Sequence, residues 1–375
     1  MNNTQQVFVS IENIAPENGT ALTPFWVGFH SGEFDTLDTG RPASEGVERI
    51  AEDGDAAALN QEFELAGLGS AQAVIPGPNG PITPGETAGL LIDVEDAANQ
   101  GRYFNYVAMV LPSNDIFVAN DEQREHLVFD RRGRFLGADF IITGDEVLDA
   151  GTEVNDEIPE NTAFFGQTVP DTGVEENGVI DLSDGFTPGG GNILSEPRFS
   201  NADFTQPGYE LARVRVFNAV VGSDEDDVLR GTRKDDYING NSGQDTLRAG
   251  GGNDRVLGGD GDDSLFGQNG DDELLGGGGN DTIRGGNGDD ILSGGAGDNV
   301  LNGGNGIDTY VLSAEGFADI RGFDSEDLIS LGADLAFSDL TVSQSRRNTL
   351  IEVEGQQIAL LRGVDATTIS ESAFV

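Results

Sequence analysis

The sequence contains no cysteine and few basic residues, and these absences exclude several classes of protein. Without cysteine there is no disulfide framework, no thiol nucleophile and no thiolate metal site. Only 20 lysines and arginines stand against 67 aspartates and glutamates, a formal net charge of −47. Such a surface repels the phosphates of nucleic acids and anionic membranes. We therefore expect no nucleic-acid partner, and divalent cations as the natural counterions.

Long apolar segments are also missing. Nowhere does the chain offer the run of about 18 apolar residues that a transmembrane helix needs. The start, MNNTQQVFVSIENIAP, lacks the basic residues and apolar stretch of a secretory signal peptide. We predict no transmembrane segment and no cleaved N-terminal signal. At 375 residues with 37% apolar composition, the chain is long enough for two or three domains.

Motifs of the common secreted hydrolases are absent as well. The two histidines, His30 and His126, do not lie in HExxH, and no GxSxG occurs, which excludes a zinc protease and an α/β-hydrolase. We interpret both histidines as ordinary loop or strand-edge residues and Trp26 as a core residue. The prediction is a protein that is not an enzyme. A glycosidase stays an alternative, because a pair of carboxylates leaves no local signature.

The first 220 residues show the alternation of apolar and polar residues that is typical of strands. It is clearest in QVFVSI, PFWVGF, TAGLLIDV, YFNYVAMVL, FLGADFIIT and YELARVRVFNAV, with turn residues between these segments. This pattern predicts an antiparallel β-sandwich over residues 1–221. One helical interruption is expected around Glu45 to Phe63, and a long loop from Gly185 to Pro207.

From Gly222 to Val311 the chain divides into ten consecutive nonapeptides without an insertion. Position eight is apolar in every copy, which suits a short strand with one side chain pointing inward. Position six is acidic in nine of the ten copies, with Asn299 as the exception; these acids are Asp227, Asp236, Asp245, Asp254, Asp263, Asp272, Asp281, Asp290 and Asp308.

Two strands and two turns close one coil every 18 residues, so equivalent aspartates stack at about 4.8 Å, the strand spacing. Stacked carboxylates repel unless a cation lies between them. Glycines let the turns adopt positive φ and direct carbonyls at one point, and Ca²⁺ requires six to eight hard oxygens. A flexible linker would not keep this register, and a phosphate-binding loop lacks the Gly-Lys-Ser/Thr signature.

The repeat resembles the nonapeptide of RTX proteins, which implies a right-handed parallel β-roll that binds several Ca²⁺ ions. The resemblance places ions between turns two repeats apart, pairing Asp245 with Asp263, Asp254 with Asp272, Asp263 with Asp281, and Asp272 with Asp290. The first two repeats have Glu225 and Lys234 in place of glycine, so we expect weak or absent sites there. The site beside Asn299 should also be weak.

The last segment, residues 312–375, has ordinary composition. Its segments LTVSQ, TLIEVE and QQIALL predict a small strand-rich cap. RTX proteins carry an uncleaved export signal at the C-terminus, so the resemblance implies type I secretion machinery as a partner. The expected location is extracellular or at the cell surface.

Residues 6–220 resemble the spondin N-terminal domain family. The similarity rests on LTPFWVGFHSGEFDTLDTGRPAS, MVLPSNDIFVAN, DAGTEVND and the terminal YELARVRVFNAV. The resemblance implies a C2-like sandwich with one Ca²⁺ held by loops, here by Asp115, Asp149 and Glu153. Alternatively, Asp115 caps a turn and the other two acids are solvated. The cysteines and tryptophan of animal members are absent, which puts the matrix partners of that family in doubt.

Together these features predict a secreted calcium-binding protein. The sandwich is expected to contact a cell surface, a polysaccharide or a matrix component, and the roll to fold after export. A carbohydrate-active enzyme and a structural surface-layer protein are the alternatives.

Overall fold

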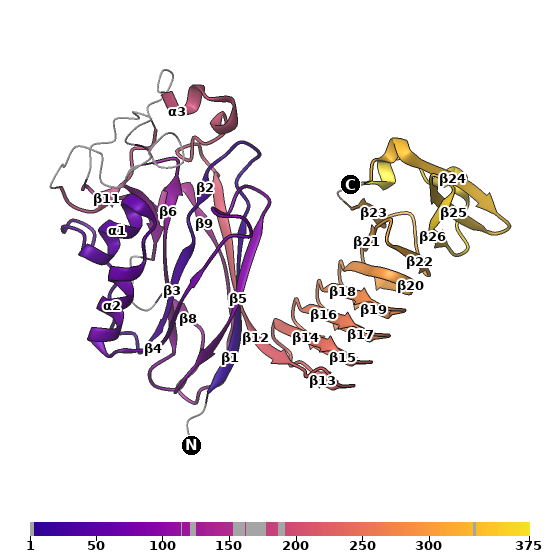
Figure 1. Ribbon diagram of the computed structural model, residues 1–375, viewed down its shortest axis with the longest axis horizontal. Helices are drawn as coiled ribbons and strands as arrows, with labels where there is room; N and C mark the ends of the chain where they lie inside the picture. The colour runs from indigo at the N-terminus through magenta and orange to yellow at the C-terminus, as the bar shows by residue number, and fades with distance from the viewer. Residues whose placement is uncertain are drawn as a thin grey trace. The chain divides into compact units, whose positions relative to one another are not determined.

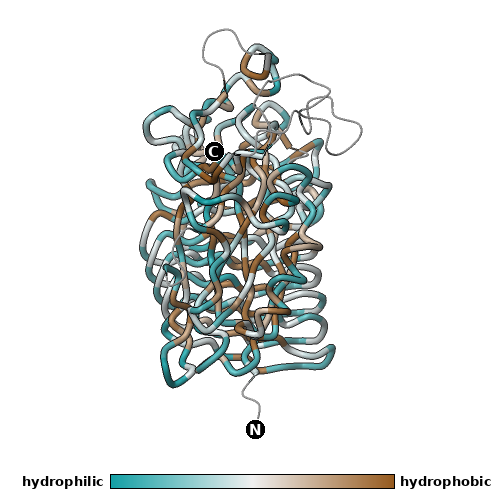
Figure 2. The backbone as a smooth tube through the Cα atoms, turned by 90° about the vertical axis from the view of Figure 1, so that its left-hand side faces the viewer, coloured by the Kyte–Doolittle hydropathy of each residue, from teal (hydrophilic) through white to brown (hydrophobic). Residues whose placement is uncertain are grey.

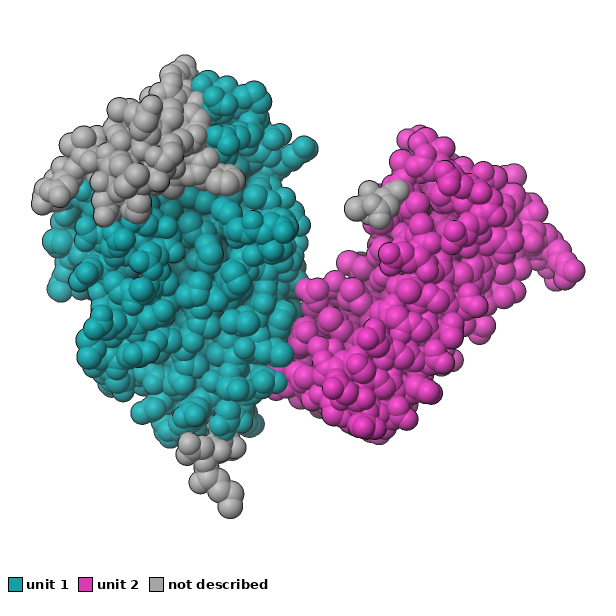
Figure 3. Space-filling model, viewed as in Figure 1, with its two compact units in different colours: residues 1–217 teal, residues 218–375 magenta. Residues whose placement is uncertain are grey.

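A computed structural model describes residues 4–113, 115–120, 125–152, 162, 178–186, 192–332 and 335–375. The chain divides into two compact units, residues 1–217 and 218–375 (Figure 3). Strands dominate both units (Figure 1), and their hydrophobic residues alternate with hydrophilic ones along the chain (Figure 2). No helix among the described residues combines the length and apolar character needed to cross a lipid bilayer.

The first unit is built from two antiparallel sheets. One sheet places β1 between β5 and β12, with β9 beside β12; its strands are β1 (Gln5–Asn13), β5 (Thr87–Val94), β9 (Ala138–Thr143) and β12 (Glu210–Val221). The other sheet runs in the order β4 (Gly69–Ile75), β3 (Phe25–His30), β6 (Tyr103–Leu111), β7 (Ile116–Ala119), β10 (Val147–Asp149) and β11 (Asp181–Leu182). Two short strands, β2 (Ala21–Leu22) and β8 (His126–Leu127), pair with β6.

The core of the first unit lies between the two sheets. Every second residue of β1 points into it, as do alternate residues of β3; examples are Val7, Val9, Phe25 and Phe29, which are all fully buried. This arrangement confirms the predicted antiparallel fold. The expected long loop before β12 contains two short helical turns, α3 (Asn192–Ser195) and η2 (Pro197–Phe199).

The helical segment forms two helices rather than the single interruption expected from the sequence. These are α1 (Glu45–Asp53) and α2 (Ala57–Ala66), and α1 ends because Gly54 adopts φ 69°. Both helices cover the outer face of the sheet that contains β3. Trp26 is fully buried there, with its ring centroid 5.5 Å from that of Phe63, so it is a core residue as predicted.

The second unit begins as a parallel roll in which each strand pairs with the strand two positions later. One sheet contains β13 (Val228–Arg230), β15 (Thr246–Gly251), β17 (Ser264–Asn269) and β19 (Thr282–Asn287). The other contains β14 (Asp236–Ser242), β16 (Arg255–Asp260) and β18 (Glu273–Gly278). The long strand β20 (Ile291–Asn305) contributes to both sheets.

Position eight of the nonapeptides forms the core of this roll. Leu247 lies opposite Leu265 and Val256 opposite Leu274, so the register is 18 residues. These side chains are fully buried, because each coil covers the apolar residue of its neighbours.

The roll is longer than the ten nonapeptides. Residues 218–221 of β12 pair in parallel with β14, and β21 (Thr309–Leu312), β22 (Gly316–Ile320) and β23 (Leu328–Leu331) continue the parallel pairing. The remaining strands form the predicted strand-rich cap. They are β24 (Leu340–Ser345), β25 (Asn348–Val353) and β26 (Gln356–Leu361), joined as an antiparallel meander.

Candidate metal centre

The acids at position six form two columns along the roll, one for each set of turns. Apart from Asp227, they are at most 2% exposed, although carboxylates are rarely buried. The first column contains Asp227, Asp245, Asp263, Asp281 and then Asn299. The second column contains Asp236, Asp254, Asp272, Asp290 and Asp308.

Backbone hydrogen bonds connect successive members of each column. The amide of Asp254 donates to Oδ1 of Asp272 at 2.8 Å, and the amide of Asp263 donates to Oδ1 of Asp281 at 2.9 Å. The same bond recurs at every step from Asp227 to Asp308. Each pair of aspartates expected to share an ion therefore lies on adjacent coils, with one carboxylate oxygen held by the backbone.

The other carboxylate oxygen, Oδ2, is buried without a hydrogen-bond partner in six of these residues. They are Asp245, Asp254, Asp263, Asp272, Asp281 and Asp290, three in each column. A buried polar atom without a partner costs about 1–3 kcal/mol, and more when it is charged. Two carboxylates about 4.8 Å apart add a repulsion of about 3 kcal/mol at an effective dielectric constant of about 20. A cation beside Oδ2 would offset both terms.

Glycine at position one keeps space open beside five of the six Oδ2 atoms; the sixth belongs to Asp254, whose repeat has Ala249 at this position. A Cβ atom on Gly258 would collide with Oδ2 of Asp263 and with the carbonyl oxygen of Gly276 on the next coil. The same collision would occur at Gly240, Gly267 and Gly285. A carboxylate oxygen and a carbonyl oxygen thus converge on one point that a side chain would fill. This donor set suits Ca²⁺, which prefers hard oxygens.

Burial also raises the pKa of the column aspartates other than Asp227, whose pKa is lowered by the hydrogen bonds from Ser223. It raises the pKa of Asp254 to about 8 and those of Asp272 and Asp290 to about 7. The pKa values of Asp263, Asp281 and Asp308 rise to about 6 for the same reason. Neighbouring carboxylates add to the effect, whereas the backbone hydrogen bond opposes it. Without a metal ion these groups take up protons near neutral pH, and Ca²⁺ competes with those protons.

At the N-terminal end of each column, a hydroxyl side chain donates a hydrogen bond to the aspartate carboxylate. Oδ2 of Asp227 accepts hydrogen bonds from the amide of Ser223 at 2.7 Å and from its Oγ at 2.9 Å. Oδ2 of Asp236 accepts the equivalent two bonds from Thr232. Both oxygens already have partners, which gives a physical reason to expect weak sites in the first two repeats.

At the far end the columns differ. Asn299 keeps the backbone bond, but its Nδ2 donates to the carbonyl oxygens of Gly295 at 3.3 Å and Gly297 at 3.5 Å. The second column continues to Asp327, whose Oδ1 accepts from the amide of Asp308 at 3.0 Å. Sequence reasoning missed Asp327 because it follows Asp308 by 19 residues rather than 18. The segment GFDSEDLIS still shows the position-six acid and the apolar position eight.

The loop site expected in the first unit is described only in part. Asp115 precedes β7, and Asp149 ends the neighbouring β10, where it pairs with Ile116. Oδ2 of Asp115 accepts from the amide of Thr152 at 3.2 Å, and Oδ1 of Asp149 accepts from the amide of Gly151 at 2.7 Å. Glu153 lies outside the described residues. Among those described, no three His, Asp or Glu side chains gather as a metal site, so this site stays a prediction.

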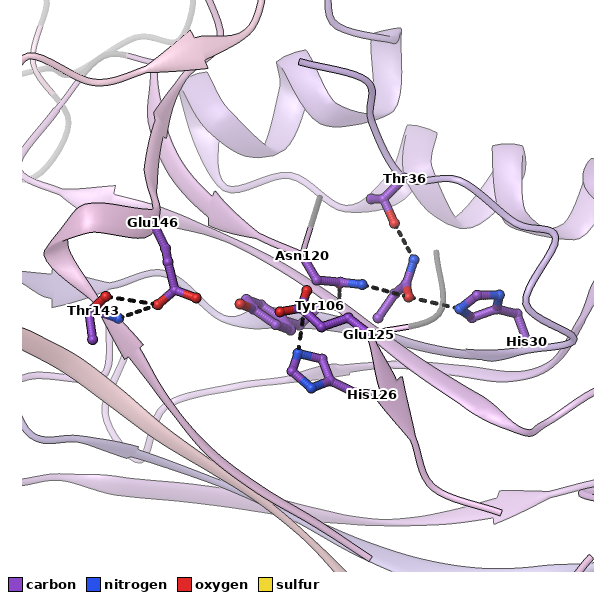
Figure 4. Close-up of polar contacts among 9 residues, drawn as sticks. His30, Thr36, Tyr106, Asn120, Glu125, His126, Thr143 and Glu146 are labelled. Carbon is purple, nitrogen blue, oxygen red and sulfur yellow. Dashed lines mark hydrogen bonds and ion pairs between the residues drawn. The ribbon is translucent and has the colours of Figure 1, made fainter. Parts of the chain in front are cut away.

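Figure 4 shows the polar contacts around the two histidines. Nε2 of His30 lies 2.8 Å from Oδ1 of Asn105, and its Nδ1 accepts from the amide of Gly32 at 3.1 Å, so the neutral ring is satisfied. His126 stacks on Phe140 with ring centroids 3.7 Å apart. Burial lowers the pKa of both rings, to about 4 for His126.

Comparison with known proteins agrees with the geometry of the roll. Residues 221–256, 248–283 and 275–310 match the family described as the RTX calcium-binding nonapeptide repeat. The nonapeptides of this chain are therefore RTX repeats, which bind Ca²⁺ and form a β-roll. No curated protein matches the chain.

Two solved structures resemble part of the chain. The extracellular lipase LipA from Serratia marcescens is 20% identical over 42% of this chain and 40% of the lipase, with a TM-score of 0.24. The AlgE6R3 subunit of the mannuronan C5-epimerase from Azotobacter vinelandii is 27% identical over 42% of this chain and 81% of the subunit, with a TM-score of 0.22. The chain thus spans about two fifths of the lipase. Neither these structures nor the family match supports the resemblance to spondin domains or an adhesive role, which both stay predictions.

Proposed function

We propose that this chain is a secreted protein whose roll folds when it meets extracellular Ca²⁺. The observation that carries the proposal is the set of six buried Oδ2 atoms without partners, three in each column. The column aspartates from Asp245 to Asp290 would hold the ions, together with carbonyl oxygens of the glycine-rich turns. A bound ion would neutralise the column carboxylates and link adjacent coils through their oxygens.

The residues of the chain supply the coupling between metal binding and folding. The Oδ2 atoms approach one another only when the coils stack, so the unfolded chain has no preformed site. Ca²⁺ that binds the folded roll therefore shifts the equilibrium toward it. Extracellular calcium modules have dissociation constants of about 10⁻⁴ to 10⁻³ M, so low cytosolic calcium would leave the roll unfolded.

Export fits this behaviour. An unfolded roll can be threaded through type I secretion machinery, whereas a folded roll of stacked coils cannot. RTX repeats are typical of secreted proteins, and we infer that the roll serves transport and folding rather than catalysis. Folding and export of the roll therefore do not require catalytic activity in the first unit.

Circular dichroism of the full chain tests the proposal, with the single tryptophan as an internal reference. Trp26 is buried in the first unit, so its fluorescence reports on that unit alone. We expect β-structure to increase when Ca²⁺ replaces a chelator, while the emission of Trp26 changes little. Identical spectra with chelator and with Ca²⁺ would contradict the proposal.

A further inference from the structure

One face of the roll carries a row of arginines, although the chain as a whole is strongly acidic. The row lies on the sheet formed by β13, β15, β17, β19 and the second half of β20. Each coil contributes one residue to the row. This is the residue at position nine of its odd-numbered nonapeptide, next to the buried position eight. In strand register the row reads Arg230, Arg248, Phe266, Arg284 and Asn302.

These arginines are not neutralised by neighbouring acids. Within residues 222–311, all of which are described, the salt bridges are limited to Arg255 with Glu273 at 3.4 Å on the other sheet. Arg230 and Arg284 are exposed, and Arg248 is half-buried. Three cations therefore face solvent along one row, in a chain that has only 20 basic residues.

Phe266 holds two of the arginines in place. The guanidinium carbon of Arg248 lies 4.4 Å from the centre of the Phe266 ring, and that of Arg284 lies 5.9 Å from it. Stacking on an aromatic ring fixes a guanidinium that would otherwise move freely. The cost of ordering these side chains is thus reduced before any ligand arrives.

A second outward row lies beside the arginines, at position seven. It consists of Val228, Thr246, Ser264, Thr282 and Val300, so three hydroxyl groups lie at its centre. Neither row contains an acid. The two rows together make a flat strip of cations, hydroxyls and one aromatic ring, with a period of about 4.8 Å.

We propose that this strip binds a linear polysaccharide that carries carboxylates along its length. The period of the strip is close to the length of one sugar ring, so successive sugars could meet successive coils. Guanidinium groups bind carboxylates in a bidentate geometry, and the hydroxyls suit the sugar hydroxyls. A single-stranded nucleic acid fits less well, because its bases stack on several aromatic residues and this strip has one.

Binding to the strip should require Ca²⁺ in the roll. Acids at position five, including Asp226, Asp262 and Asp298, lie two residues before position seven, the position of the hydroxyl row. In the metal-free protein these acids and the column aspartates repel a polyanion. Bound Ca²⁺ removes much of that negative charge and stacks the coils that align the arginines.

Binding of an oligogalacturonate to the calcium-loaded full chain tests the proposal. We expect the double substitution Arg248→Gln with Arg284→Gln to weaken binding at least tenfold, and Phe266→Ala to weaken it several-fold. The matched control is Arg346→Gln with Arg347→Gln, which removes the same charge from the exposed turn between β24 and β25 and should change binding less than twofold. A calcium titration of each variant shows whether the roll still folds.

Three results would overturn the proposal. The first is a wild-type chain that does not bind the oligogalacturonate in low salt. The second is a double variant with a folded roll that binds like wild type, because Ca²⁺ bridges between acids of the protein and the sugar would then explain binding. The third is equal or tighter binding of a single-stranded oligothymidylate of matched length. A neutral dextran oligomer should bind weakly in every variant.

Discussion

Asn299 accepts a hydrogen bond from the amide of Asp281 at 2.8 Å, as an aspartate would at the same position of the column. Its Nδ2 meanwhile donates to the carbonyl oxygens of Gly295 and Gly297 within its own turn. The amide nitrogen therefore supplies donors at the position where six of the other turns have an oxygen without a partner. Asn299 thus ends the first column with a side chain that satisfies its own turn and needs no cation.

Replacing Asn299 with aspartate should extend the first column by a calcium site. We expect isothermal titration calorimetry to show additional Ca²⁺ binding, and the roll to be less stable in chelator by about 1–3 kcal/mol, because a donor is lost and a buried carboxylate is gained. Asn280→Asp is the matched control, since it adds the same charge at an exposed position-five residue. Equal calcium binding by both variants would contradict this role of Asn299.

The column aspartates should matter far more than their exposed neighbours. Asp263→Asn with Asp272→Asn removes one carboxylate from each column, and we expect at least tenfold weaker Ca²⁺ binding with lower cooperativity. A tenfold change corresponds to about 1.4 kcal/mol. The control, Asp262→Asn with Asp271→Asn, removes the same charge from position five, where both residues are exposed. Calcium titrations followed by circular dichroism that coincide for the two double variants would rule out the column assignment.

Calcium affinity should fall as the pH is lowered from about 8 to about 6. Burial raises the pKa of Asp254 to about 8 and that of Asp281 to about 6 in the metal-free roll. At pH 6 many column carboxylates are therefore protonated, and Ca²⁺ must displace those protons. Calorimetry in two buffers of different ionisation enthalpy measures the protons released. Binding with no proton release at pH 7 would show that the carboxylates are already ionised.

Acid should destabilise the first unit through its histidines. Burial lowers the pKa of His126 to about 4, so the unfolded chain binds more protons than the folded one below pH about 6.5. The stability that neutral His126 contributes is present above this pH and is lost as the pH falls toward 4. Each pKa unit corresponds to about 1.4 kcal/mol, so the loss is on the order of 2–3 kcal/mol.

Thermal unfolding followed by Trp26 fluorescence in excess Ca²⁺ measures this effect. His126→Phe keeps a ring to stack on Phe140 but cannot take up a proton, so its melting temperature should fall less between pH 7 and pH 4.5. His30 stays in both proteins and contributes equally to each. Parallel pH dependence in the two proteins would show that His126 is not the group responsible.

The nine-residue register made the roll the most predictable part of this molecule. Because Leu247 and Leu265 occupy the same phase, one argument about position eight applied to every coil, and the same was true of position six. The strand-rich cap and the sandwich followed from alternation alone. The division of the helical segment follows from the local stop signal at Gly54 and could have been predicted. The register of the sandwich strands depends on contacts between distant residues, so a local pattern could not show it.

The ends of the columns were harder to predict for a different reason. The Oδ2 atoms of Asp227 and Asp236 accept hydrogen bonds from Ser223 and Thr232. These bonds depend on the shape of each turn, which the sequence pattern does not show. Asp327 was hidden by one additional residue in the chain. The row of arginines was visible in the sequence at position nine, but its significance depends on which coils lie side by side.

The 18-residue register has a consequence for how such a chain can change in length. Odd-numbered and even-numbered nonapeptides belong to different sheets, since Leu265 faces Leu247 and Leu274 faces Val256. Deletion of one nonapeptide between Arg248 and Arg284 would transfer every later strand to the opposite sheet, so Arg284 would leave the row of Arg248. Deletion of two would only shorten the roll. Recombination among the repeats should therefore add or remove nonapeptides in pairs.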